Sequence, residues 1–131
     1  MKKEDAVQLM LDFYGAEPDY PFNSAPDTAC FRHPRNKKWF ALLLGSLSRR
    51  CLGMEAEEEA PVINLKCDPL LIPSLIDGEK VFRAYHMNKE HWISVLLDSP
   101  ITLEELAFLT DISYHLVGNS RNRKSPETID G

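Results

Sequence analysis

The sequence predicts an α+β protein, a two-layer α/β sandwich with a five-stranded, mostly antiparallel sheet. Amphipathic helical patterns stand near both ends of the chain, and short β-rich stretches lie between them. With 131 residues, of which 44% are hydrophobic, the chain suits one compact domain with one core. The expected element order is α-β-β-β-α-β-β-α, with the helices on one face of the sheet.

The first element is a helix over residues 3–14. Its apolar residues recur at helical spacing, which predicts one core-facing stripe of Ala6, Leu9, Met10 and Phe13. Acidic residues in the first turn favour the helix through its macrodipole, and Gly15 is a typical stop.

Three strands are expected next, over residues 28–33, 38–45 and 62–66. The first two form a hairpin. The connection over residues 46–61 carries four glutamates near its end and is predicted to be a mobile loop.

Residues typical of helix N-termini predict two more helices. Asp68-Pro69 predicts a short helix with Asp68 as N-cap, which Pro73 distorts unless it lies in the first turn. Thr102 and Glu105 form a capping box that begins the last helix, ending at Gly118-Asn119. Its predicted apolar face consists of Leu103, Leu106, Leu109, Ile112, Leu116 and Val117. The domain then covers residues 1–118, and residues 119–131 form a flexible tail.

Residues 81–85 and 93–97 are expected to pair as a hairpin around a short polar connection. Strand parity turns Ile93, Val95 and Leu97 toward the core, and Phe82 and Ala84 with them. The opposite face is then open, and parity places six residues on it: Asn64, Lys66, Arg83, Tyr85, Trp92 and Ser94.

The connecting stretch also carries a family resemblance. His86-Met87-Asn88-Lys89-x-His91-Trp92, followed by Val95 and Leu97-Asp98, resembles the signature of the MmcQ/YjbR family. Three further stretches resemble family elements in the same order: residues 19–22 (DYPF), 39–42 (WFAL) and 64–69 (NLKCDP). The resemblance spans about residues 1 to 118. It implies a small two-layer α/β protein, often labelled DNA-binding by structural analogy, with no established enzyme activity and no cofactor.

Two surfaces are candidates for binding DNA. The hairpin tip is basic, since Arg32, Arg35, Lys37 and Lys38 lie within seven residues. Cations of this kind neutralise phosphates, although a charge run is usually just solvated, and a solvated hairpin tip is the favoured explanation. The open sheet face offers Lys66, Arg83, Tyr85 and Trp92, a mixture of cations and aromatics that stacks on bases. Asn88 and Lys89 at the second hairpin supply polar contacts.

The same aromatic face also suits a protein or peptide partner, or a second copy of the chain, because Trp, Tyr and Arg are favoured interface anchors. The net charge of −5 weighs against nucleic acid, but the distribution of charge matters more than its sum. The third alternative is a half-exposed sheet face that binds no partner, on which Trp92 covers the pleat.

Other classes of function are disfavoured. His86 and His91 lack a third metal ligand in register, with Asp98 and Cys67 the nearest choices, so no metal is expected. No phosphate-binding glycine loop and no acid–base pair can be assigned, which predicts a protein that is not an enzyme. Three widely spaced cysteines, no apolar run of membrane length and no secretory signal predict a cytoplasmic protein.

Overall fold

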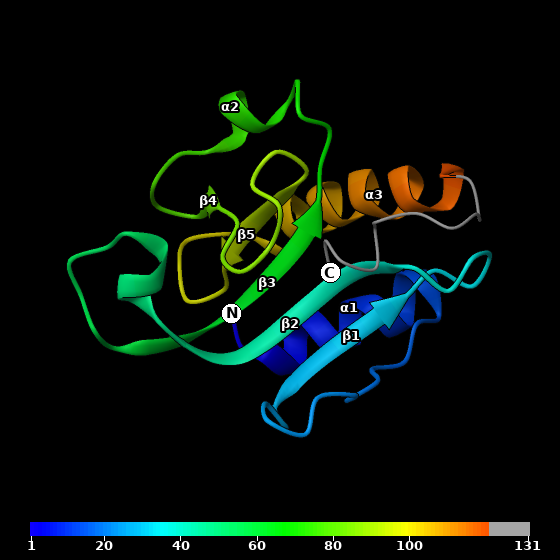
Figure 1. Cartoon of the computed structure of the whole chain (residues 1–131), viewed down its shortest axis with the longest axis horizontal. Coiled ribbons are helices and arrows are strands. Elements are labelled where there is room, and N and C mark those ends of the chain that lie inside the picture. Colours follow the sequence, from blue (N-terminus) through cyan, green and yellow to red (C-terminus); the bar gives the residue numbers. More distant parts are fainter. Residues whose placement is uncertain (121–131) are drawn as a thin grey trace.

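The computed structural model describes residues 1–120 and has the predicted α+β architecture. A five-stranded antiparallel sheet in the order β1-β2-β3-β5-β4 is covered on one face by the two long helices (Figure 1). The strands are β1 (Thr28–Arg32), β2 (Trp39–Ser48), β3 (Glu59–Lys66), β4 (Val81–Arg83) and β5 (Trp92–Leu96). The helices are α1 (Lys3–Tyr14), α2 (Ile72–Leu75) and α3 (Leu103–Asn119), with a 3-10 turn η1 (Arg49–Leu52) after β2.

Both long helices begin and end largely where their sequence signals stand. Gly15 ends α1 in the left-handed region, with φ of 61°. Thr102 Oγ1 accepts from the Glu105 backbone N–H, and the Glu105 carboxylate accepts from Thr102 N, which confirms the capping box of α3. Asn119 still belongs to α3, so the predicted tail would start later; residues 121–131 lie outside the described residues.

The prediction for α2 was wrong at its start. Asp68 does not cap a helix at Pro69; its carboxylate accepts from Leu70 N in a turn, and the helix begins at Ile72. Pro73 lies in the first turn of this shorter helix, where the missing N–H costs no intrahelical bond. The expected loop over residues 46–61 is also shorter, because β2 runs to Ser48 and β3 begins at Glu59.

The main core lies between the helices and one face of the sheet. It buries Met10, Phe31, Phe40, Ile63 and Leu106 among others, as the helical and strand patterns predict. Ser113 ties α3 to the sheet: its Oγ accepts from Lys66 N and donates to Phe40 O at 2.5 Å. This contact continues the β2–β3 ladder, which ends at Ala41 and Leu65. It fixes α3 at the sheet end where β1, β3 and β4 finish.

The second face of the sheet is not open, contrary to the sequence prediction. Two further buried clusters cover it, one including Cys30, Met87 and Trp92 and the other including Phe82 and Leu96. The chain after β4 folds back over this face, and Leu52 and Met54 from the β2–β3 connection pack on it as well. Parity identifies which residues share a face but not which segment covers that face.

Candidate nucleic-acid interface

Four of the predicted site residues belong to the β1–β2 hairpin, which clamps the end of α3. The last carbonyls of a helix have no intrahelical donor, and here the hairpin supplies donors. Asn36 Nδ2 donates to Val117 O at 2.8 Å, and Arg35 Nη1 donates to Gly118 O at 3.0 Å. Lys38 Nζ lies 3.4 Å from Ser120 Oγ. The hairpin cations therefore also complement the negative end of the α3 dipole.

His33 completes this clamp. Its ring lies against Tyr114, with ring centroids 4.2 Å apart, and its Nδ1 accepts from Arg35 N. Burial, followed by the charges of Arg35 and His115, lowers the pKa of His33 below its ordinary value. The neutral ring is thus part of the packing between the hairpin and α3.

A carboxylate faces Arg32 across the start of the hairpin. Its Nη2 lies 3.4 Å from Asp19 Oδ2, and its guanidinium lies 5.9 Å from the centre of the Trp39 ring. Lys37 is exposed at the tip and adopts a left-handed backbone with φ of 66°. The tip of the hairpin therefore presents Arg35 and Lys37 to solvent.

The aromatic part of the predicted site is placed differently from the prediction. Trp92 is only 2% exposed and packs in the cluster with Cys30 and Met87, so its ring is not available for base stacking. Its indole N–H has no hydrogen-bond partner among the described residues. Tyr85 is half-buried over the second face. Its pKa is raised by a hydrogen bond with the Cys51 side chain and by burial.

Asn64 and Ser94 were also assigned to the open face, and both are fully buried. Ser94 Oγ donates to Asn64 Oδ1 at 2.5 Å and accepts from Tyr85 N, while Asn64 Nδ2 donates to Tyr85 O. These bonds hold the start of the 84–91 connection against the sheet. The polar residues are therefore structural, because burial requires each of them to have partners.

The parity of β4 was predicted one residue out of phase. Val81 pairs with Val95 and faces the helices, whereas Phe82 pairs with Ser94 and faces the second cluster. Arg83 pairs with Ile93 and so belongs to the helix side, where it is exposed at the edge of the sheet. In a short strand with apolar residues on both faces, the alternation of apolar and polar residues is too weak to show which residues face the helices.

Although these details differ, the register brings all the predicted cations to one end of the sheet. Arg32 pairs with Trp39 at the β1–β2 end, Lys66 pairs with Trp92, and Arg83 ends β4 beside β5. Because all neighbours are antiparallel, these positions and the connection that carries Lys89 share that end. We call it the basic end. It comprises Arg32, Arg35, Lys37, Lys38, Lys66, Arg83 and Lys89.

Most of the exposed cations of the basic end keep their charge uncompensated. Among the described residues, no ion pair joins a carboxylate to Arg35, Lys37, Arg83 or Lys89. Lys89 Nζ donates to Ala84 O, a neutral carbonyl. Asn88 is exposed beside it and accepts from Glu90 N. The strand spacing gives the basic end a width of roughly 19 Å across five strands.

The histidines of the central stretch do not form a metal site with other described residues. Within residues 1–120, no group of three or more His, Cys, Asp or Glu side chains is placed to hold a metal ion. His86 is exposed, adopts a φ of 60° and lies against Tyr85. Through its backbone, His91 accepts from Cys67 N and donates to Asn88 O. No helix of these residues is both long and apolar enough to cross a membrane.

Comparison with known proteins agrees with this architecture. The YjbR family model matches residues 11–116. The Bacillus subtilis (strain 168) protein called uncharacterized protein YyaQ is 38% identical over 116 residues, which cover 88% of this chain and 98% of that protein. A crystal structure of a Pseudomonas syringae protein superposes with a TM-score of 0.84 at 38% identity, over 89% of this chain and 99% of that one.

A more distant Deinococcus radiodurans protein shares the fold, with a TM-score of 0.68 at 22% identity over 98% of this chain and 86% of that one. The predicted resemblance is thus confirmed, and the chain belongs to the YjbR family.

Proposed function

We propose that the protein is a binding module without catalytic activity, and that its basic end binds nucleic acid through backbone phosphates. The observation that supports this proposal is the convergence of seven Lys and Arg residues from four separate segments on one end of the sheet. Phosphate neutralisation by Lys and Arg provides most of the affinity of non-specific nucleic-acid binding.

The acidic net charge is compatible with this proposal because the charges are segregated. The glutamate run at residues 55–59 and Asp98 lie toward the opposite end of the sheet, where β2 ends and β3 begins. Arg49 pairs with Asp98 there, and Arg50 pairs with Glu57. The carboxylates at the basic end are fewer than its cations: Asp68 and Glu90 lie there, and Asp19 is already paired with Arg32.

Binding at the basic end is expected to read the backbone and not the bases. The ring of Trp92 is buried, and the exposed residues are cations together with Asn88. Phosphate contacts fix position without reading sequence. A width of roughly 19 Å allows contact with at most about five phosphates along one strand, since phosphates recur every 3.4 Å or so.

Titration of labelled single- and double-stranded DNA, followed by fluorescence anisotropy, tests the proposal. We expect saturable binding whose log affinity falls linearly with log salt, with a slope between about −3 and −5. The test variant is Lys37→Asn with Lys89→Gln, because asparagine tolerates the left-handed backbone at position 37. It should weaken binding and make the slope shallower by about 2.

A matched control removes the same charge elsewhere. Lys3→Gln with Arg50→Gln lowers the net charge by the same amount but changes positions outside the basic end. If both double variants weaken DNA binding equally, the effect depends on net charge alone, and the assignment of the site to the basic end is overturned. Absence of binding by the native protein at low salt would overturn the function itself.

The alternative hypothesis requires an open sheet face that docks a protein partner. That face is covered by buried side chains, so it is not available for docking. Exposed apolar residues occur on the helix layer instead, and they support a separate inference.

A further inference from the structure

A groove of about 410 Å³ runs between α1 and α3 on the outer side of the helix layer. Its size lies within the range of about 300–1,000 Å³ that is usual for binding pockets. It is lined by Asp5, Gln8, Leu9, Asp12, Phe13, Leu103, Glu104 and Ala107, and we call it the acidic groove. Along α1 it extends from Asp5 to Phe13, about 12 Å at the rise of an α-helix.

The floor of the acidic groove exposes large apolar side chains that the sequence assigns to the core. The helical pattern places Phe13 and Leu103 on the buried faces of their helices, yet they are 63% and 53% exposed. One prediction is wrong on each helix, and both residues line the same groove. Places where local pattern and structure disagree are where function is most often found.

The rim of the acidic groove is negative throughout. Asp5, Asp12 and Glu104 line it, and no lysine or arginine does. Asp5 accepts from Lys2 N and Asp12 accepts from Gln8 Nε2, both neutral donors. Among the described residues, none of these three carboxylates forms an ion pair. Three uncompensated negative charges therefore surround an exposed apolar floor.

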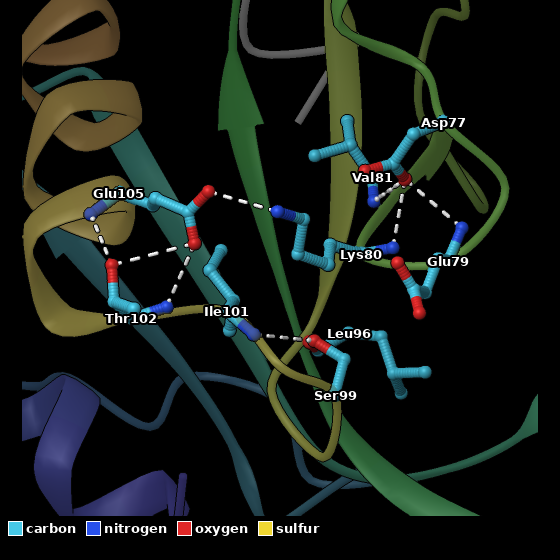
Figure 2. A network of polar contacts seen from close by, with 9 residues as sticks. All are labelled: Asp77, Glu79, Lys80, Val81, Leu96, Ser99, Ile101, Thr102 and Glu105. Atoms are coloured by element: carbon cyan, nitrogen blue, oxygen red, sulfur yellow. Dashed lines mark hydrogen bonds and ion pairs between the residues drawn. The ribbon is translucent and has the colours of Figure 1, made fainter.

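A second hollow, on the other flank of α3, differs from the acidic groove because its lining includes a lysine beside the carboxylates of Asp77, Glu104 and Glu105. It is lined by Lys80 and Glu105 among others, and Figure 2 shows Lys80 Nζ bonded to the Glu105 carboxylate, at 2.8 Å. The Lys80 ammonium holds the pKa of Glu105 below its usual range. Asp77 nearby is also satisfied: burial raises its pKa, but the N–H groups of Val81, Glu79 and Lys80 outweigh this and lower it. Part of the negative charge of this hollow is therefore compensated within the fold, unlike that of the acidic groove.

We propose that the acidic groove binds a cationic amphipathic helix of a partner protein. Apolar side chains at positions i, i+4 and i+7 of such a helix span about 10 Å, which matches the length of the floor. Lysine or arginine on the flanks would face Asp5, Asp12 and Glu104. This inference is independent of nucleic-acid binding, because it concerns the helix layer and not the basic end.

The charge of the groove distinguishes this occupant from others. In a symmetric dimer the groove of one copy would face that of the other, which would place three carboxylates against three and leave them repelling each other. A nucleic acid would be repelled in the same way. Only a partner that combines an apolar stripe with positive charge complements both the floor and the rim.

The probe for this proposal is a labelled 18-residue synthetic peptide with Leu at i, i+3, i+4 and i+7 spacing and Lys on its other face. A second peptide has the same composition in scrambled order. Fluorescence anisotropy in 150 mM salt should show saturable binding of the amphipathic peptide at least about tenfold tighter than the scrambled one. Equal binding of the two would show charge attraction alone and overturn the proposal.

Variants of the groove locate the site. Phe13→Ser with Leu103→Ser should weaken binding at least about tenfold, since buried apolar anchors dominate interface affinity. The matched control, Leu70→Ser with Leu71→Ser, removes two exposed leucines outside the groove and should change binding less than about twofold. Retained binding by the Phe13/Leu103 variant would overturn the proposal.

The charge contribution is tested separately. Asp12→Asn with Glu104→Gln should weaken binding by about three- to tenfold and make it less sensitive to salt. Glu17→Gln with Glu58→Gln removes the same charge outside the groove and should have little effect. If both double variants weaken binding equally, the site is not the groove.

The mass of the native protein and of the Phe13/Leu103 variant, measured by light scattering, tests the remaining occupant. A native dimer that becomes a monomer in the variant would identify a second copy as the occupant and overturn the proposal. A monomer in both cases, with peptide binding lost only in the variant, supports it.

Discussion

The basic end of the sheet and the acidic groove on the helix layer differ in how far the fold itself uses their residues. At the basic end, Arg35 and Asn36 donate to the last carbonyls of α3, and His33 packs on Tyr114. In the acidic groove, Phe13 and Leu103 are mostly exposed, and the carboxylates have only neutral partners.

This difference determines how mutations should be interpreted. A charge removed from the hairpin changes a possible phosphate contact and also the clamp on α3. Removing Phe13 or Leu103 from the acidic groove is expected to change little that holds the fold, because both side chains are mostly exposed. Binding defects at the basic end therefore need a stability measurement beside them, and Lys37 and Lys89 are better probes there than Arg35. Four predictions test this contrast, in order of decreasing expected effect on stability.

Gly118→Val should be the most damaging, lowering the free energy of unfolding by about 3 kcal/mol. A Cβ at this position would lie 2.4 Å from His33 Nε2, and the ring cannot easily retreat because Tyr114 and the Arg35 N–H hold it. Urea denaturation measures the change. Asn119→Ala, one residue later on the exposed side of α3, is the control and should be close to neutral. Equal effects would mean that the hairpin does not clamp the helix.

Asn36→Ala should cost about 2 kcal/mol, because it removes two hydrogen bonds of a buried side chain, one donated to Val117 O and one accepted from Lys38 N. Val117 O keeps the bonds that it accepts from Ser120. Lys37→Asn, at the neighbouring exposed position, should cost less than about 0.5 kcal/mol. Thermal unfolding of both variants checks the pair. If Lys37→Asn proves as costly as Asn36→Ala, the tip cation is structural too, and its role as a phosphate contact loses support.

A smaller effect is expected from pH. The folded pKa of His33 is lower than its unfolded value near 6.5, so the unfolded chain binds the proton first as pH falls. His33 therefore contributes little pH dependence well above about 6.5. Between that value and its folded pKa it destabilises the fold by at most about 1.4 kcal/mol per pH unit. Stability measured from pH 7.5 to 5 should fall less in His33→Gln than in the native protein.

The smallest effect on stability is expected in the acidic groove. Phe13→Ser and Leu103→Ser should each change the free energy of unfolding by less than about 0.5 kcal/mol, because the side chains are mostly solvated already. Leu106→Ala, on the buried side of α3, should lower the free energy of unfolding by about 2–5 kcal/mol. Chemical denaturation of the three variants compares them. A large loss in Phe13→Ser would mean that the groove floor belongs to the core and not to a binding surface.

Much of the architecture follows from local signals in the chain. The bounds of α1, the capping box of α3 and the five strands in their order are visible in spacing, cap residues and β-rich runs. These features depend on residues within a few positions of one another. The resemblance on residues 86–92 also indicates the family whose model matches residues 11–116.

The placement of the site residues depended instead on contacts between distant segments. Trp92 lies on the face of the sheet that strand parity predicts. Its ring is nevertheless buried, because it packs in a cluster with Met87 and Cys30. Phe13 and Leu103 fit their helical patterns, yet both are mostly exposed in the groove between α1 and α3. Parity and periodicity assign residues to faces, but burial depends on what another part of the chain places over each face.

By itself the sequence determined the element order, the family and the list of cations. Only the tertiary structure decided that those cations share one end of the sheet, that the hairpin among them clamps α3, and that an acidic groove opens between α1 and α3. The physical reason is the distance along the chain over which each kind of interaction acts. Propensity, capping and periodicity act over a few residues, whereas the pairing of antiparallel strands and the packing of helices join positions up to 100 residues apart, as in the contact between Tyr14 and Tyr114.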